Sequence, residues 1–242
     1  HAKDSGRDCF QFFSASLNEA ALQRLLLEGH LRRAVQNNEL VAYFQPQVDA
    51  RTNTLVSLEA LMRWNRPEAG LVAPAQFIHV AEESGAIHEL GRWILQTSSR
   101  ESVARGWHAR GIKVSVNISI QQFKRPDVVD TLTDAVTSTG LSPSSVSLEI
   151  TESVLADHGR AVPTLRALKD AGFSIVLDDF GTGYSSLTYL KALPLDALKI
   201  DRSFIRNITT DERDRAIVTA IIGVARSLAM DVVAEGVEHK AQ

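Results

Sequence analysis

Short apolar runs alternate with helix-like stretches along most of this chain, and this alternation limits the possible folds more than any other feature. Runs with the length and composition of strands occur at 41–48, 54–63, 113–119, 146–150, 174–177, 197–200 and 231–234. Helix-like stretches lie between most of them, at 74–83, 87–110, 121–139, 157–171, 185–190 and 212–228. Repeated units of one strand and one helix indicate an α/β protein.

The spacing of the runs also predicts how the strands pair. The first two are separated only by the loop 49–53, so we expect an antiparallel hairpin. The later runs are separated by helices, which predicts parallel strands joined by right-handed crossovers. We therefore expect a TIM-like (β/α) barrel with an antiparallel first strand, and a flat doubly wound sheet is the alternative. Seven runs are present, so the last strand of such a barrel is expected beyond Gln242.

The composition excludes several classes of protein. A net charge of −3 provides no basic field for long nucleic acid, whereas 44% hydrophobic residues can fill a sizeable core. Cys9 is the single cysteine, which predicts a reducing compartment, and no apolar run approaches the ~20 residues that cross a bilayer. The histidines form no cluster with zinc-ligand spacing, and no serine-hydrolase elbow is present.

Oxygen-bearing side chains follow short apolar segments in five of the predicted strands. They are Glu59, Asn117, Glu149, the pair Asp178–Asp179, and Glu235. Each alone has an ordinary explanation as a helix cap or a surface turn residue. In a barrel, however, the carboxyl ends of the strands meet at one site, where the carboxylates would repel one another and need cations. Oxygen ligands of this kind favour Mg²⁺, Mn²⁺ or Ca²⁺ over zinc.

The adjacent pair Asp178–Asp179 is the most informative part of this set. Successive residues of a strand point in opposite directions, so both can face one site only where the strand turns into a loop. One aspartate could then bridge two ions about 3.5–4 Å apart, an arrangement that activates water against a phosphodiester. The alternative is that the pair caps a helix starting near Ser185. The segment Gly181–Gly183 lacks the further glycine or lysine of a nucleotide loop and is expected to be a mobile loop beside the metals.

Lys199 and Asp201 lie on one face of a predicted strand at a spacing of two residues. Two interpretations are open. They form a buried ion pair with each other, or the ammonium of Lys199 lies near the attacking water and the developing phosphate charge.

Taken together, these residues resemble the EAL domain family, which hydrolyses the bacterial second messenger cyclic di-GMP. The resemblance runs from about Leu40 to Gln242 and rests on a series of motifs in order. They are FQPQVD (44–49), EALMRW (59–64), NISIQQ (117–122), LEITES (148–153), LDDFGTGYSS (177–186), LKIDRSF (198–204) and VAEGVE (233–238).

The resemblance implies roles for individual residues, by motif position. It implies two divalent cations, Mg²⁺ or Mn²⁺, with Ca²⁺ as an inhibitor. One ion would be held by Glu59, Asn117, Glu149 and Asp178, and the other by Asp178, Asp179 and Glu235. Lys199 would orient and activate the water, with Glu235 as a candidate base and Glu59 as a further catalytic residue. Arg63 and Gln122 would contact the dinucleotide, with Gln45 and Glu238 as secondary candidates, and Glu152 would support the 178–186 loop.

The resemblance also implies an activity and a setting. The expected enzyme is a cyclic-di-GMP-specific phosphodiesterase that forms linear pGpG, and the alternative is an inactive cyclic di-GMP receptor that acts through protein partners. Members of the family often form dimers near the 178–186 loop. A cytoplasmic bacterial domain is expected, with any membrane anchor elsewhere in the parent protein.

Both ends of the chain carry a further expectation. The opening residues resemble the closing segment of a GGDEF domain, the diguanylate cyclase module often fused upstream. The family pattern continues beyond Gln242 into a last strand and helix with a Gln-Gly-Tyr motif near the substrate. The expected parts are therefore a GGDEF remnant (1–16), a helical linker (17–38) and a C-terminally incomplete EAL domain (39–242).

Overall fold

A computed structural model describes residues 15–67, 69–156, 158–181 and 190–242. The predicted GGDEF remnant and most of the predicted helix at 185–190 lie outside these residues. The predicted linker is a helix, α1 (Ala15–Ala34), and Asn38 follows it with a positive φ of 56°. The end of α1 packs on the main domain, because Leu31 and Ala34 are buried and Arg32 Nη2 donates to the carbonyl of Ser84 at 3.2 Å.

The described residues form one eight-stranded sheet with the order β1-β2-β4-β5-β6-β7-β8, and β3 pairs only with β2. The strands are β1 (Leu40–Val48), β2 (Leu55–Arg66), β3 (Gly70–Val72), β4 (Lys113–Asn117), β5 (Val146–Thr151), β6 (Ser174–Phe180), β7 (Ala197–Ile200) and β8 (Asp231–Ala234). β1 and β2 are antiparallel, and every later pair from β2–β4 to β7–β8 is parallel. The predicted pairing is confirmed.

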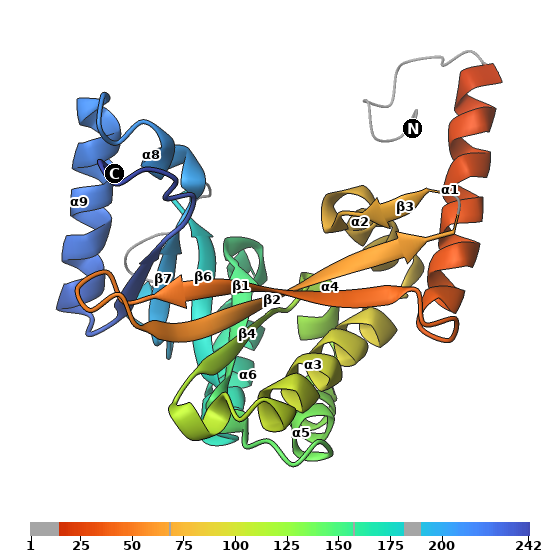
Figure 1. The fold of residues 1–242 in the computed structure, drawn as a ribbon, viewed down its shortest axis with the longest axis horizontal. Helices are drawn as coiled ribbons and strands as arrows, with labels where there is room; N and C mark the ends of the chain where they lie inside the picture. Colours follow the sequence, from red (N-terminus) through yellow and green to blue (C-terminus); the bar gives the residue numbers. More distant parts are fainter. Residues whose placement is uncertain (1–14, 68, 157, 182–189) are drawn as a thin grey trace.

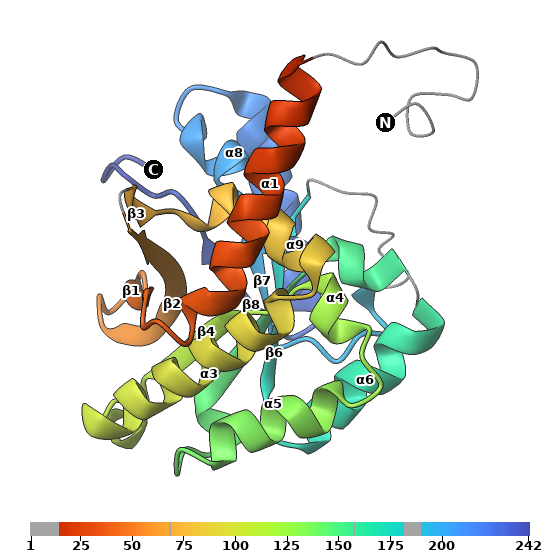
Figure 2. The same cartoon turned by 90° about the vertical axis from the view of Figure 1, so that its right-hand side faces the viewer.

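The strand order also decides between the two predicted architectures. In a doubly wound sheet the order reverses at a switch point, whereas here each parallel strand pairs with the next one along the chain. The sheet curls around its own axis, with helices on its outer side (Figures 1 and 2). The fold is therefore the expected TIM-like barrel type with an antiparallel first strand, and the flat sheet is excluded.

The helices follow the strands in the expected alternation. They are α2 (Ile78–Ser84), α3 (Ile87–Ala104), α4 (Ile120–Phe123), α5 (Val128–Thr137), α6 (His158–Asp170), α8 (Arg202–Arg206) and α9 (Glu212–Ser227). Strands β5 and β7 are buried over almost their whole length, as expected for parallel strands covered on both faces. Among the described helices, none is long and apolar enough to cross a membrane.

Several details differ from the sequence prediction. The helix predicted at 74–83 is α2, which begins at Ile78 after a 3₁₀ turn at Pro74–Gln76. The single helix predicted at 121–139 is wrong, because α4 and α5 are separate helices with Pro126 between them. Proline lacks the backbone N–H that a helix interior needs and disfavours helical geometry at the residue before it. The helix predicted at 87–110 ends earlier, at Ala104, and Gly106 follows with a left-handed φ of 63°. The short elements α8 and β3 were not predicted.

Candidate metal centre

The predicted site residues lie at the carboxyl ends of the parallel strands. Asn117 is the last residue of β4 and pairs in register with Glu149 on β5. Glu235 directly follows β8. Glu59 lies in the middle of β2, but the parallel ladder between β2 and β4 ends one residue later, at Ala60. β2 continues beyond that point because β1 and β3 still pair with it.

Lys199 lies at the centre of this group, which the sequence did not predict. Its side chain is 2% exposed, and its ammonium nitrogen forms ion pairs with four carboxylates of the described chain. The N–O distances are 3.1 Å to Glu59, 2.8 Å to Glu149, 3.3 Å to Asp178 and 2.6 Å to Glu235. The side chains from β2, β5, β6 and the end of β8 are thus brought together around one cation.

An ion pair between Lys199 and Asp201, one of the two interpretations that the sequence left open, is not formed among the described residues. Asp201 is the N-cap of α8 instead, and its carboxylate accepts a hydrogen bond from the backbone N–H of Ser203 at 3.0 Å. The Ser203 hydroxyl and backbone donors lower the pKa of Asp201. The charge of Asp201 therefore stabilises the start of a helix and leaves Lys199 to the strand-end carboxylates.

The pair Asp178–Asp179 faces the site by means of a β-bulge. The β6–β7 register shifts between Leu177 and Phe180, and pairing resumes between Phe180 and Ile200. Asp179 has a positive φ of 54°, and its backbone N–H donates to Asp178 Oδ1 at 2.9 Å. The sequence predicted that the strand turns into a loop here, whereas the strand continues. The extra residue of the bulge lets successive side chains point the same way.

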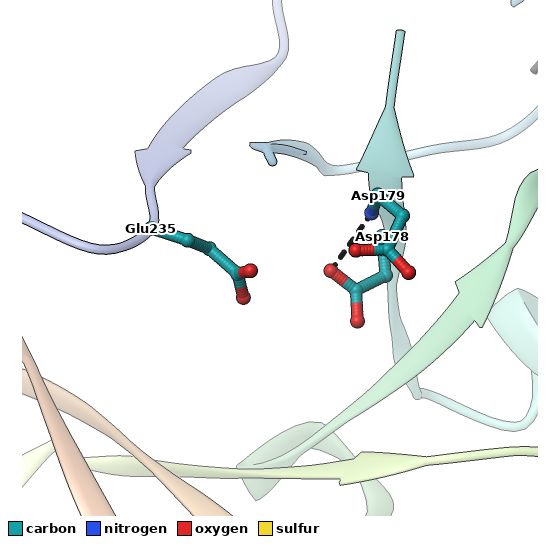
Figure 3. Close-up of side chains that lie close together, drawn as sticks. All are labelled: Asp178, Asp179 and Glu235. Atoms are coloured by element: carbon teal, nitrogen blue, oxygen red, sulfur yellow. Dashed lines mark hydrogen bonds between the residues drawn. The ribbon is translucent and has the colours of Figure 1, made fainter. Parts of the chain in front are cut away.

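Asp178, Asp179 and Glu235 form a group that could hold a cation. One carboxylate oxygen from each residue lies within 4.8 Å of those of the other two. Figure 3 shows the two aspartates on β6 opposite Glu235, which reaches toward them from the end of β8. The donors are all carboxylate oxygens, which suits hard cations such as Mg²⁺ and Mn²⁺.

Asn117 joins the group around Lys199 through Glu59. Asn117 Nδ2 donates to Glu59 Oε1 at 2.9 Å. This contact uses the nitrogen of the amide, so the amide oxygen remains as a potential ligand.

Burial and mutual repulsion change the proton affinities of these groups. Burial raises the pKa of Glu149 to about 7, because the attraction of Lys199 only partly opposes it and the charge of Glu59 adds to it. Burial likewise raises the pKa values of Asp179 and Glu235, and the charge of Asp178 acts in the same direction. For Lys199, burial lowers the pKa, but the charges of Glu149, Asp178 and Glu59 outweigh it and leave the pKa above its ordinary value. Perturbed groups clustered at strand ends are typical of functional sites.

Two predicted substrate-binding residues lie on the face of the β1–β2 hairpin that carries Glu59. Gln45 is paired in register with Glu59 across the β1–β2 hairpin, so both side chains share one face of the sheet. Arg63 lies four residues after Glu59 on the same strand and therefore also on that face. Its guanidinium donates to the carbonyl of Met62 at 2.8 Å and lies 5.6 Å from the ring centroid of Tyr43.

The other predicted residues contact other parts of the chain. Glu152 Oε1 accepts a hydrogen bond from the backbone N–H of Gly181 at 2.9 Å, which joins it to the segment that follows β6. Glu238 is exposed beyond β8. Gln122 is 6% exposed and forms a capping box with Ser119 at the start of α4, so the structure does not bring it to the strand-end carboxylates.

Comparisons with known proteins identify relatives of this chain. The sequence profile of the EAL domain matches residues 28–242. The bifunctional diguanylate cyclase/cyclic di-GMP phosphodiesterase MucR of Pseudomonas aeruginosa is 42% identical over 245 residues, covering 100% of this chain and 36% of MucR. The cyclic di-GMP phosphodiesterase NbdA of the same organism is 41% identical over 245 residues, covering 100% of this chain and 31% of NbdA.

A solved structure gives the same result. The MucR phosphodiesterase in complex with c-di-GMP has a TM-score of 0.85 and 42% identity, covering 89% of this chain and 88% of that one. The chain spans only about a third of the length of the curated relatives it matches.

Proposed function

This chain belongs to the EAL domain family, and we propose that it hydrolyses cyclic di-GMP to the linear dinucleotide pGpG. The observation that carries the proposal is the gathering of Glu59, Glu149, Asp178 and Glu235 around Lys199. These carboxylates, with Asn117 and Asp179, supply enough oxygen ligands for two ions. A relative that retained the fold but lost these ligands would fit a receptor role better.

The two proposed metal ions share one protein ligand, Asp178. Glu59, Asn117, Glu149 and Asp178 hold the first ion, and Asp178, Asp179 and Glu235 hold the second. The positions of the donors agree with this division, because Asn117 contacts Glu59 while Asp179 lies within reach of Glu235. Mg²⁺ and Mn²⁺ are the proposed ions. Ca²⁺ is proposed to inhibit, because it takes more ligands at longer and less regular distances.

The ions supply Lewis acidity for the phosphodiester and lower the pKa of water. Lys199 donates hydrogen bonds from its ammonium to the water and to the phosphate oxygens as negative charge develops on them. Glu235, whose pKa is raised by burial, accepts a proton of the attacking water. A bond forms between the water oxygen and phosphorus while the bond from phosphorus to the ribose 3′-oxygen breaks, and the leaving oxygen takes up a proton from solvent to become the 3′-hydroxyl. The product keeps its 5′-phosphate.

Substrate contacts in the proposal come from both sides of the cluster. Arg63 and Gln45, on the face of the hairpin that carries Glu59, bind phosphate and base edges of the dinucleotide. Glu238 contributes from the segment after β8, and Gln122 contributes from α4. Glu152 supports the loop after β6 through its hydrogen bond to Gly181.

The proposal also includes a homodimer of this chain. Two copies associate near residues 178–186, a segment that begins with the proposed ligands Asp178 and Asp179. The proposed parent is a longer cytoplasmic bacterial protein with an upstream GGDEF domain. The name of the relative MucR, a bifunctional diguanylate cyclase/cyclic di-GMP phosphodiesterase, supports this proposal. Size-exclusion chromatography with light scattering tests the dimer, which a monomer at micromolar concentration would contradict.

Replacing Glu59 by alanine is the direct test of the activity. We expect turnover to fall at least about a hundredfold, because a ligand of one ion and a partner of Lys199 are both removed. Chromatographic measurement of pGpG after incubation with cyclic di-GMP and Mg²⁺ or Mn²⁺ checks this. The control is Glu101→Ala, which removes an exposed carboxylate paired with Arg105 on α3. Undiminished hydrolysis by Glu59→Ala would refute the assignment, and tight cyclic di-GMP binding without pGpG would favour the receptor alternative.

Metal affinity is expected to rise with pH up to about pH 7. Glu149 must lose its proton to bind a cation, and burial raises its pKa to about 7. Below that pH the proton competes, so the apparent association constant for Mg²⁺ should fall by up to about tenfold per pH unit. Titration calorimetry between pH 5.5 and 8 measures it. An affinity that is flat over this range would contradict a role for Glu149 as a ligand.

A further inference from the structure

A cavity of about 380 Å³ lies between helices α3, α4 and α5, on the outer layer of the fold. These helices lie side by side in both views (Figures 1 and 2). None of the strand-end carboxylates lines the cavity, and the one residue that it shares with the proposed substrate contacts is Gln122. Its size falls within the usual range for small-molecule pockets.

The mouth of the cavity carries a carboxylate and a guanidinium from one helix. Glu89 and Arg92 line it, both are exposed, and they are neighbours on the surface of α3 at a spacing of three residues. Within the described chain neither side chain takes part in a salt bridge. Both are therefore available to a ligand, one as an acceptor and the other as a donor.

A second guanidinium in the wall is held in a fixed orientation. Arg125 binds Asp127 through two hydrogen bonds, of 2.8 Å from Nε and 2.7 Å from Nη2. This bidentate pair neutralises its charge and fixes its plane. A planar, fixed guanidinium is a surface on which an aromatic ring can stack.

The interior of the cavity is partly apolar and contains a polar atom without a partner. Val128, Leu132 and Ala135 of α5 are buried side chains that contribute to its lining. His88 Nδ1 is buried and has no hydrogen-bond partner among the described residues. Burial, together with the nearby charge of Arg125, lowers the pKa of His88, so its ring is neutral at pH 7. A buried polar atom without a partner is costly unless a ligand or water satisfies it.

From Glu89, Arg92, the fixed Arg125 and the apolar lining we propose that this cavity binds a guanine nucleotide. The carboxylate of Glu89 only accepts hydrogen bonds, and guanine presents two adjacent donors, N1–H and the 2-amino group, on one edge. Adenine presents an acceptor nitrogen there, which would face the carboxylate unfavourably. The guanidinium of Arg92 matches the acceptors O6 and N7 of guanine. The ring then lies against Val128 and Leu132, with Arg125 over one face.

GMP is the probe that tests the proposal, in titration calorimetry on the whole chain with Mg²⁺ present. We expect a dissociation constant on the order of 0.1 mM and weaker binding of AMP. Arg92→Met and Glu89→Gln should each weaken GMP binding by about tenfold, because each removes a paired contact to the base. The matched controls are Arg100→Met on α3 and Asp134→Asn on α5, exposed positions outside the cavity.

Two further comparisons make the result decisive. Glu89→Gln replaces a pure acceptor by an amide with one donor and one acceptor, so the preference should shift toward AMP. In Glu59→Ala, GMP binding should persist even where hydrolysis of cyclic di-GMP is lost, which separates this site from the metal centre. The proposal is overturned if GMP does not bind, if Arg92→Met binds it as wild type does, or if binding disappears in Glu59→Ala.

Discussion

Replacing Lys199 by methionine is expected to destabilise the metal-free protein by about 3 kcal/mol at pH 8. The substitution leaves Glu59, Glu149, Asp178 and Glu235 without the cation that all four contact, and uncompensated buried charge is costly. Turnover should fall on the order of 10³-fold as well, because the ammonium near the reacting phosphate is lost.

The destabilisation should depend on pH in a defined direction. Without Lys199, Glu149 and Glu235 lose the attraction that opposes the effect of burial, so their pKa values, already raised in the folded state, rise further. A group whose pKa is raised on folding favours the folded state below its unfolded pKa and loses that contribution as pH rises through the folded value. Lys199→Met should therefore approach wild-type stability near pH 5 and lose stability toward pH 8. In wild type, the contribution of Lys199 persists up to its unfolded pKa near 10.5.

Thermal and urea unfolding in EDTA and in Mg²⁺ measure these effects. We expect Mg²⁺ to restore much of the lost stability of Lys199→Met, because a divalent cation replaces the missing positive charge. The control is Lys113→Met, since Lys113 lies on β4 and its ammonium contacts the hydroxyl of Ser174, not a carboxylate. Equal stability of Lys199→Met and wild type in EDTA at pH 8 would show that the lysine does not compensate the acidic cluster.

The strand pattern could be read from the sequence because its signals are local. Buried parallel strands are short apolar runs, and the hairpin loop between β1 and β2 is marked by its length. The helix break at Pro126 was also readable, although apolar periodicity across the break concealed it. β3 and α8 were missed because elements of three and five residues carry too little periodicity to detect.

The candidate site was predicted only in part, because some of its features have a local signal in the sequence and others do not. Strand-end positions identify Glu59, Asn117 and Glu149 as neighbours once a barrel is assumed, and the structure does bring them together. Lys199 contacts carboxylates that are distant in sequence because four strands close around it. No local sequence pattern encodes that closure, so the sequence could not decide between these carboxylates and Asp201. The bulge at Asp178–Asp179 depends likewise on the register between β6 and β7.

The bulge makes Asp179 the position where activity and stability are expected to change in opposite directions. A non-glycine residue at a φ of 54° costs roughly 1 kcal/mol, and Asp179 also lies beside the charge of Asp178. Asp179→Gly should therefore raise the stability of the metal-free protein by about 1 kcal/mol. It should lower turnover on the order of 10³-fold, since several kcal/mol of charge stabilisation depend on the second ion.

Asp179→Ala separates the two causes, because it removes the carboxylate but keeps a side chain at the strained position. Both variants lose the repulsion from Asp178 and a proposed metal ligand, so both should be inactive. Only glycine relieves the backbone, so it should be more stable than alanine by about 1 kcal/mol in urea unfolding with EDTA. Equal stabilities would refute the strain, and wild-type turnover in either variant would refute the metal role. The combined result would show that this bulge is retained for the second ion at a cost to the fold.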